Sequence, residues 1–169
     1  DCIIVNNTFY ENDTEHQGYG EIGLQFDTQN NRIQNNIFYA NSQSLFIGNN
    51  YTQNSGSTVD YNLYFASAGV GESVWQWKAE SYQGLAAYQA GTGNDTHSLF
   101  LEPGFVDAAQ ANFHLQPDSS AIDRGQSVAG MGLYDIDGLA RVVGATVDIG
   151  ADEHSAGLSL YLPVLRKNN

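Results

Sequence analysis

Cysteine and basic residues are scarce in this sequence. The single cysteine, Cys2, has no partner within the chain, so no intrachain disulfide can form and the redox compartment stays undetermined. Lys and Arg together number 6, against 19 Asp and Glu, which gives a formal net charge of −13. A field of that sign repels nucleic acid, anionic lipid and bare polyuronates, so we exclude nucleic acid as a partner. The longest apolar run, residues 158–165, is far too short to cross a bilayer, so no membrane span is predicted.

The sequence does contain enough apolar material for a core. Hydrophobic residues make up 41% of the chain, which argues against wholesale disorder, and the length suits one domain or one section of a repeat protein. The polar residues are mostly Asn, Gln, Ser and Thr rather than charged residues. Surfaces of this kind suit extracellular, sugar-facing or self-packing proteins.

A short phrase is repeated near the start of the chain. Residues 6–10 read Asn-Asn-Thr-Phe-Tyr, and after 29 residues the phrase returns at 35–39 as Asn-Asn-Ile-Phe-Tyr. After a further 26 residues a looser copy, Tyr-Asn-Leu-Tyr-Phe, occupies 61–65. A repeat of this length, made of short β-prone runs separated by Asn and Gly, predicts a solenoid in which each unit buries its apolar face against its neighbours.

The predicted fold is therefore all-β, a section of right-handed parallel β-helix with a C-terminal cap that contains one short helix. Residues 1–67 hold the coils, 68–157 hold further coils and the cap, and 158–169 hold a terminal strand and tail. Parallel strands joined by polar turns fit the spacing, with Asn adopting left-handed backbone at the corners and stacking its amides between coils. The chain starts in what reads as mid-strand, so the exposed first coil is expected to pair with a second copy or with missing upstream coils.

The segment 68–100 breaks the repeat. Residues 74–78 alternate with period 2 and predict a strand, and residues 82–88 predict a short helix with Ser81 as N-cap and Gly91 beyond its end. Four aromatic residues in this segment are candidates for a sugar-stacking platform: Trp75, Trp77, Tyr82 and Tyr88. The alternative is that these rings belong to the core.

Further short strands are predicted in the C-terminal part. The candidate segments are residues 104–106, 113–115, 141–143 and 147–149, followed by a final strand at 158–162.

The stretch 81–153 resembles the C-terminal region of secreted right-handed parallel β-helix proteins of the choice-of-anchor Q type. Four pieces carry the resemblance: residues 82–98 (Tyr-Gln-Gly-Leu-Ala-Ala-Tyr onward), 102–107 (Glu-Pro-Gly-Phe-Val-Asp), 113–125 (Phe-His-Leu-Gln-Pro onward), and 135–138 with 147–153. Two departures are visible, because the family usually has Pro where Ser120 stands and Asp where Glu102 stands. The resemblance implies an extracellular or surface-attached setting. It does not imply one activity, because polysaccharide lyases, glycoside hydrolases and adhesive proteins share this architecture.

Candidate catalytic residues are few. A lyase needs a clustered Lys or Arg base, and the basic residues here are scattered through the sequence. A glycoside hydrolase needs two carboxylates across a cleft, and the acidic residues between 11 and 27, Asp13 and Glu21 among them, are near enough in sequence to supply a pair. Solvated acidic loops are the simpler interpretation of that segment. No enzyme is therefore favoured for this chain.

The densest carboxylate group is a candidate cation site. It comprises Asp135, Asp137, Asp148, Asp152 and Glu153. Oxygen ligands of this kind suit Ca²⁺, but the spacing does not complete an EF-hand. The alternative is that Asp135 and Asp137 make turn hydrogen bonds while Asp148 pairs with Arg141 or Arg124. The four histidines show no metal-binding spacing.

The function predicted from the sequence is a non-catalytic structural, adhesive or assembly-forming module of a secreted or cell-surface protein, self-associating through its open end. Two alternatives stay open: the C-terminal part of a carbohydrate-active enzyme, and a carbohydrate-binding module that contacts polysaccharide. The first interpretation requires no cofactor, and calcium binding at the acidic cluster is an additional hypothesis.

Overall fold

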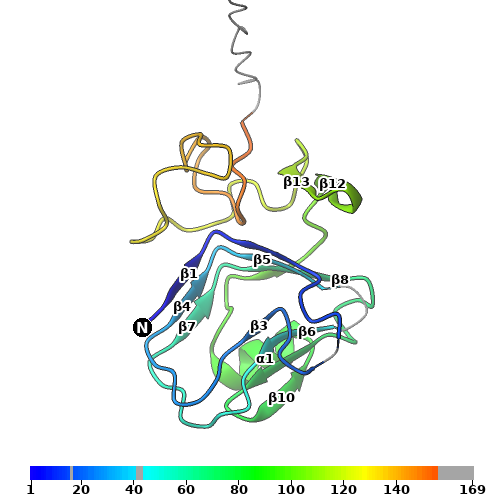
Figure 1. Ribbon diagram of the computed structural model, residues 1–169, viewed down its shortest axis with the longest axis vertical. Coiled ribbons are helices and arrows are strands. Elements are labelled where there is room, and N and C mark those ends of the chain that lie inside the picture. The colour runs from blue at the N-terminus through cyan, green and yellow to red at the C-terminus, as the bar shows by residue number, and fades with distance from the viewer. Residues whose placement is uncertain (16, 41–43, 156–169) are drawn as a thin grey trace, which may run out of the picture.

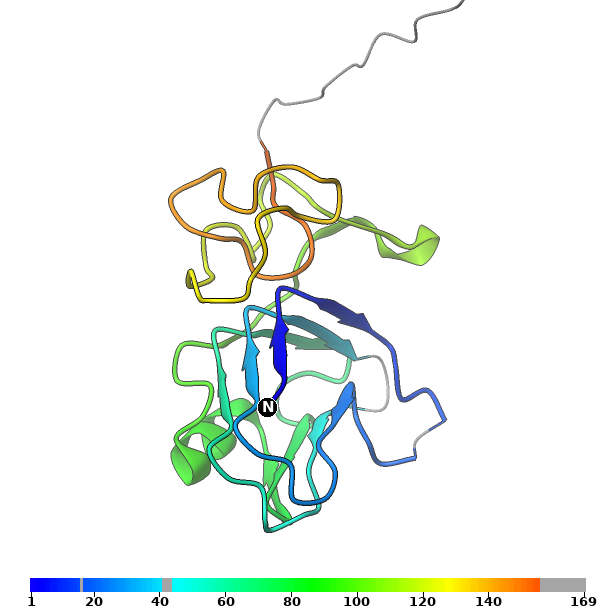
Figure 2. The same ribbon diagram turned by 60° about the vertical axis from the view of Figure 1, so that its left-hand side comes forward.

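The structure is a computed structural model that describes residues 1–15, 17–40 and 44–155. The predicted strand and tail at 158–169, and His16, lie outside the described residues. Three sheets of short strands surround a common core, and the chain after them forms a separate layer beside one corner (Figures 1 and 2).

The first sheet contains three parallel strands, in the order β1 (Ile3–Val5), β4 (Arg32–Gln34) and β7 (Thr58–Asp60). The second contains four parallel strands, in the order β2 (Thr8–Tyr10), β5 (Ile37–Ala40), β8 (Leu63–Ala66) and β11 (Leu99–Phe100). The pairing places Thr8 beside Ile37, and Ile37 beside Leu63. The repeated phrase therefore aligns position by position across the second sheet.

The third sheet combines both strand directions. Its order is β3 (Ile22–Gly23), β6 (Leu45–Gly48), β9 (Val74–Trp77) and β10 (Glu80–Gln83), with β10 antiparallel to β9. The reversal follows from Lys78 and Ala79, whose φ angles of 53° and 67° give the left-handed pair of a two-residue hairpin. The succession of parallel strands in this sheet therefore ends at β9.

One helix, α1 (Leu85–Thr92), packs against β9 and β10. It begins after Gly84, not after the predicted Ser81, and ends at Gly93, where the left-handed C-cap N–H donates to the carbonyl of Gln89. Downstream, β12 (Phe105–Asp107), the 3₁₀ turn η1 (Ala108–Gln110) and β13 (Asn112–Leu115) form a two-stranded antiparallel hairpin. The strands predicted at 141–143 and 147–149 are absent, because these residues lie in turns and irregular loops.

The predicted all-β right-handed parallel β-helix with a C-terminal cap is wrong. The strands are divided among four sheets, two of those sheets contain antiparallel pairs, and a helix packs on the third sheet. From residue 116 to 155, the described chain has only turns, loops and the isolated bridge between Tyr134 and Ala140. The arrangement is α/β-like, with several parallel sheets and a helix, and is not one continuous solenoid.

Aromatic side chains fill the core between the sheets. Phe38 is fully buried and stacks on Phe9 at 4.8 Å between ring centroids on one side and on Tyr64 at 5.2 Å on the other. Trp75 of β9 and Tyr88 of α1 complete the same cluster. Because equivalent positions of successive repeats supply Phe9, Phe38 and Tyr64, the repeated phrase specifies this stack directly.

Candidate functional site

The second Asn of each repeat builds a ladder of side-chain amides. Asn7 Nδ2 donates to Asn36 Oδ1 at 3.1 Å, and Asn36 Nδ2 donates to Asn62 Oδ1 at 3.1 Å. Each amide oxygen also accepts a backbone N–H, from Asn7 at 3.0 Å and from Asn36 at 2.9 Å. Asn36 and Asn62 are fully buried, so these bonds satisfy polar groups that water cannot reach.

Asp95 ends the ladder on the side of α1. Its Oδ1 accepts from Asn62 Nδ2 at 3.1 Å and from the Ser98 hydroxyl, and its Oδ2 accepts from the Tyr64 hydroxyl at 2.8 Å. Burial raises the pKa of this carboxyl to about 6, although its hydrogen bonds act in the opposite direction. An ionised carboxylate accepts but does not donate, so the donor-to-acceptor chain stops at this residue.

The first Asn of the repeat points to the other side of the corner. Asn6 Nδ2 donates to the carbonyl of Asp148 at 3.0 Å, and Asn35 Nδ2 donates to the carbonyl of Gln126 at 2.8 Å. Both residues adopt φ of 55°, the left-handed conformation predicted for Asn at the corners. These bonds attach the C-terminal layer to the sheets at the corner visible in Figure 2.

At the opposite end of the ladder, no further strand among residues 1–15, 17–40 and 44–155 pairs with the sheets. β1, β2 and β3 are each the terminal strand of their sheet, and all three belong to the first repeat (Figure 1). The carbonyl of Cys2 and the N–H of Asn6 form backbone hydrogen bonds with β4. Because bonding alternates along a strand, the backbone N–H groups of Ile3 and Val5 point away from β4. Ile3 is 58% exposed, and Asn7 Oδ1 accepts no hydrogen bond among the described residues.

The five carboxylates of the predicted cation site do not converge on one point, and several of them accept hydrogen bonds from backbone N–H groups. Asp135 accepts from the N–H groups of Asp137 and Leu139, at 3.0 and 2.7 Å, which confirms the turn role expected of it. Asp148 accepts from the N–H groups of Asp123 and His154, both at 2.7 Å. The ion pair of Asp148 with Arg141 or Arg124 is not among the contacts of the described residues.

Glu153 and Arg141 lie within this same loop layer. Glu153 accepts from the N–H groups of Val143 and Asp148, at 3.1 and 3.0 Å, and burial raises the pKa of its carboxyl to about 7. The guanidinium of Arg141 donates to the carbonyls of Gly150, Tyr134 and Ala151. These side chains therefore hold irregular backbone in place, as strands do elsewhere in the molecule.

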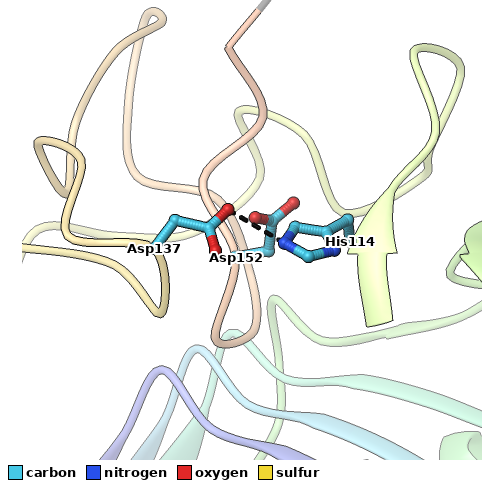
Figure 3. Close-up of side chains that lie close together, drawn as sticks. All are labelled: His114, Asp137 and Asp152. Carbon is cyan, nitrogen blue, oxygen red and sulfur yellow. Dashed lines mark hydrogen bonds and ion pairs between the residues drawn. The ribbon is translucent and has the colours of Figure 1, made fainter. Parts of the chain in front are cut away.

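Two of the five predicted carboxylates do meet, together with a histidine. Asp137, Asp152 and His114 each offer one ligand atom, and these atoms lie within 4.8 Å of one another (Figure 3). Asp137 Oδ2 lies 2.9 Å from His114 Nε2. Burial raises the pKa of the Asp152 carboxyl, and the N–H of Leu115 donates to its Oδ2 at 2.8 Å.

Sequence reasoning missed His114, which lies 23 residues before Asp137. Neither spacing nor a local motif connects the two, because β13 and the loop of residues 134–140 meet only in the folded layer. The sequence signal for His114 is its spacing of two from Asn112. On a strand this spacing places both side chains on the same face, where the amide can orient the ring.

The predicted sugar-stacking residues belong to the core. Trp75 and Tyr88 are fully buried, Trp77 is 8% exposed, and Tyr82 packs against the same cluster. A sugar ring cannot stack on ring faces that other side chains cover. The alternative interpretation, that these rings belong to the core, agrees with the structure.

The acidic N-terminal loop is also occupied by backbone contacts. Both oxygens of Asp13 are used, accepting from the N–H groups of four successive residues, Gln17 to Gly20, at 2.9 to 3.1 Å. Burial raises the pKa of Asp13, but the four N–H donors outweigh it and leave the pKa below its ordinary value. A general acid needs the opposite shift, so Asp13 is suited to holding the loop.

Comparison with known proteins gives a bacterial relative that is itself uncharacterized. No family model matches the sequence, and no solved structure matches it. Over 119 residues, 70% of this chain, the sequence is 41% identical to the uncharacterized protein YwoF of Bacillus subtilis (strain 168). The chain spans about a quarter of that relative's length.

Proposed function

We propose that this chain is a non-catalytic structural or assembly-forming module of a secreted or cell-surface protein. We further propose that it self-associates through the edge formed by β1, β2 and β3. The observation that carries the proposal is the end of the amide ladder at Asn7, where three sheets terminate together and Asn7 Oδ1 accepts no hydrogen bond from the part of the chain that the structure describes. The resemblance of residues 81–153 to secreted proteins of the choice-of-anchor Q type supports the extracellular setting.

Unpaired strand edges favour the addition of further strands. Ile3 on β1 presents an N–H and a C=O to the outside, and Val5 presents its N–H, whereas the Val5 carbonyl accepts from Asn7 Nδ2 at 3.1 Å. The same alternation applies to Thr8 and Tyr10 on β2. Strand addition across β1 and β2 would satisfy these groups together. Main-chain hydrogen bonds of this kind supply affinity without a dedicated pocket.

The two ends of the stack of sheets differ, which determines the kind of assembly. At the far end α1 contacts β9 and β10, and the carbonyl of Val59 on β7 accepts the N–H of Asp95 at 2.7 Å. A head-to-tail contact would need that end to be open. Two copies therefore meet through the same edge on each, and such a self-complementary interface closes as a dimer.

The carboxylates singled out as candidate catalytic or cation-binding residues support a structural role. Asp13 uses both its oxygens to accept backbone N–H groups, as do Asp148 and Glu153. Such carboxylates stabilise loops and are not free to exchange protons with a substrate.

Light scattering coupled to gel filtration tests the proposal. We expect the purified chain to show about twice its monomer mass of 18.4 kDa at high concentration. Val5→Pro removes an outward N–H without removing a bond to β4, and proline is tolerated at such an edge position. This variant should be monomeric at the same concentration, with an unchanged circular dichroism spectrum.

Val5→Thr is the matched control, because it keeps the N–H and a β-branched side chain; it should dimerise like the parent chain. Ile3→Lys provides a second edge variant if Val5→Pro does not fold. A parent chain that stays monomeric at every concentration would overturn self-association. A dimer that survives in both edge variants would overturn the assignment of the interface to β1.

A further inference from the structure

In the group of His114, Asp137 and Asp152, a ring nitrogen of His114 faces a carboxylate oxygen of Asp137. This arrangement does not depend on how the chain assembles. Asn112 Oδ1 accepts the backbone N–H of His114 at 3.3 Å, which identifies this atom as the oxygen of the amide. The same oxygen lies 2.5 Å from Nδ1 of the His114 ring. The ring proton therefore lies on Nδ1, and Nε2 of the neutral imidazole presents a lone pair.

That lone pair points at a carboxylate. Nε2 lies 2.9 Å from Oδ2 of Asp137, and both atoms are acceptors when the ring is neutral. Two acceptors at this distance require a positive charge between or beside them. Either the ring takes a second proton, or a cation binds both atoms.

Asp152 favours a bound cation. The residue is only 7% exposed, and its Oδ2 is fixed by the N–H of Leu115. Its other oxygen has no hydrogen-bond partner among the described residues, and its carboxylate joins the group with His114 and Asp137 (Figure 3). A buried carboxylate with a free oxygen is costly unless a positive charge lies close to it. A second proton on the imidazole would bond to Asp137 but would leave the other oxygen of Asp152 without a hydrogen bond among the described residues.

We propose that His114 Nε2, Asp137 and Asp152 bind a divalent transition-metal ion, with Zn²⁺ the best match to the donors. Tetrahedral ligands about 2.1 Å from zinc lie about 3.4 Å apart, which falls between the 2.9 Å of His114 to Asp137 and the 4.8 Å limit of the group. The bond from Nδ1–H to Asn112 is the outer-shell contact that orients a metal-binding imidazole. A cavity of about 160 Å³ beside the three side chains has room for water as fourth ligand.

The donor set also separates this site from the calcium site predicted from the acidic residues. Ca²⁺ takes six to eight oxygen ligands, whereas this group offers one imidazole nitrogen and two carboxylates. The ion would join β13, which carries His114, to the loops that carry Asp137 and Asp152. Since those loops contain no strand, the metal would act as a cross-link within the C-terminal layer.

Isothermal titration of the chelator-stripped chain with ZnCl₂ tests the site, with thermal unfolding as a second readout. We expect one Zn²⁺ per chain, a raised melting temperature with zinc, and no binding of Ca²⁺ at the same concentration. Asp137→Asn and His114→Ala should each weaken zinc binding at least tenfold. Asp137 has a half-exposed side chain, so its variant should fold even if His114→Ala does not.

His97→Ala is the matched control. His97 Nδ1 lies 2.7 Å from Asp60 Oδ2, and this exposed histidine with its half-buried aspartate is not in the group with metal-ligand geometry. This variant should bind zinc like the parent chain. Absence of zinc binding at millimolar concentration, or binding that survives in Asp137→Asn, would overturn the proposal. Equal stabilisation by Ca²⁺ would overturn the choice of metal.

Discussion

The buried carboxyl of Asp95 should make the stability of this protein depend on pH. It is fully buried at the end of the amide ladder, where Asn62, Ser98 and Tyr64 donate to it. Burial raises its pKa from the ordinary 3.8 to about 6. A folded-state pKa above the unfolded value means that the folded chain holds this proton more tightly than the unfolded chain does.

The sign and size of the effect follow from that difference. Below pH 3.8 the group is protonated in both states, and its full contribution to stability is present. As the pH rises toward 6 the unfolded chain loses its proton first, so the free energy of unfolding falls. At about 1.4 kcal/mol per pH unit, the interval between 3.8 and about 6 corresponds to a loss of about 3 kcal/mol.

Asp95→Asn should remove this loss. The amide oxygen still accepts from Asn62 and Ser98, and the new NH₂ group faces the Tyr64 hydroxyl, which can accept. Urea unfolding of both proteins from about pH 4 to about pH 8 measures the difference between them, in which other titrating groups such as Glu153 cancel. We expect the stability of the variant relative to the parent to rise by about 2 kcal/mol across that range, because part of the full change lies below pH 4. A difference that stays constant with pH would refute the account of Asp95.

Two further predictions concern the ladder and the edge. Asn36→Ala should lower the free energy of unfolding by about 3–5 kcal/mol in urea titrations, because its amide satisfies groups on both neighbouring repeats, whereas Asn7→Ala at the open end should cost about 1 kcal/mol. Equal losses at the two positions would contradict the ladder. The dimer should strengthen with added NaCl in analytical ultracentrifugation, because each copy carries a net charge of −13. Weakening by salt would indicate an interface held by ion pairs.

The repeated phrase made the parallel pairing predictable. Asn recurs where the chain needs left-handed backbone and an amide to stack, and the aromatic residues after it recur at core positions. The register that aligns residues 8, 37 and 63 follows from these two requirements together. Local chemistry and long-range packing agree here, so the sequence alone carried the information.

The departures from the predicted fold arise where no residue type marks them. Lys78 and Ala79 form a left-handed hairpin without the Asn or Gly that usually signals one, so the antiparallel strand β10 could not be foreseen. In the C-terminal layer, hydrogen bonds from carboxylates to backbone replace strand pairing. Residues 141–143 and 147–149 resemble strands in sequence because they are rich in apolar β-branched residues, but they lie in loops.

The candidate metal centre was predictable in part. The density of carboxylates directed attention to Asp137 and Asp152, and the structure brings these two together. Asp135 and Asp148 instead accept hydrogen bonds from backbone N–H groups. Composition alone cannot distinguish this use of a carboxylate from metal binding. His114 joins the group only through the placement of β13.

Hydrogen exchange at the amides of β1 and β2 tests the self-association most directly. The N–H groups of Ile3, Val5, Thr8 and Tyr10 point to the open edge, whereas those of neighbouring residues bond within the sheets. We predict that exchange at these four amides slows as protein concentration rises, while exchange within β5 and β8 stays constant. Fast exchange at all four amides in concentrated protein would contradict the proposal that this edge is an assembly surface.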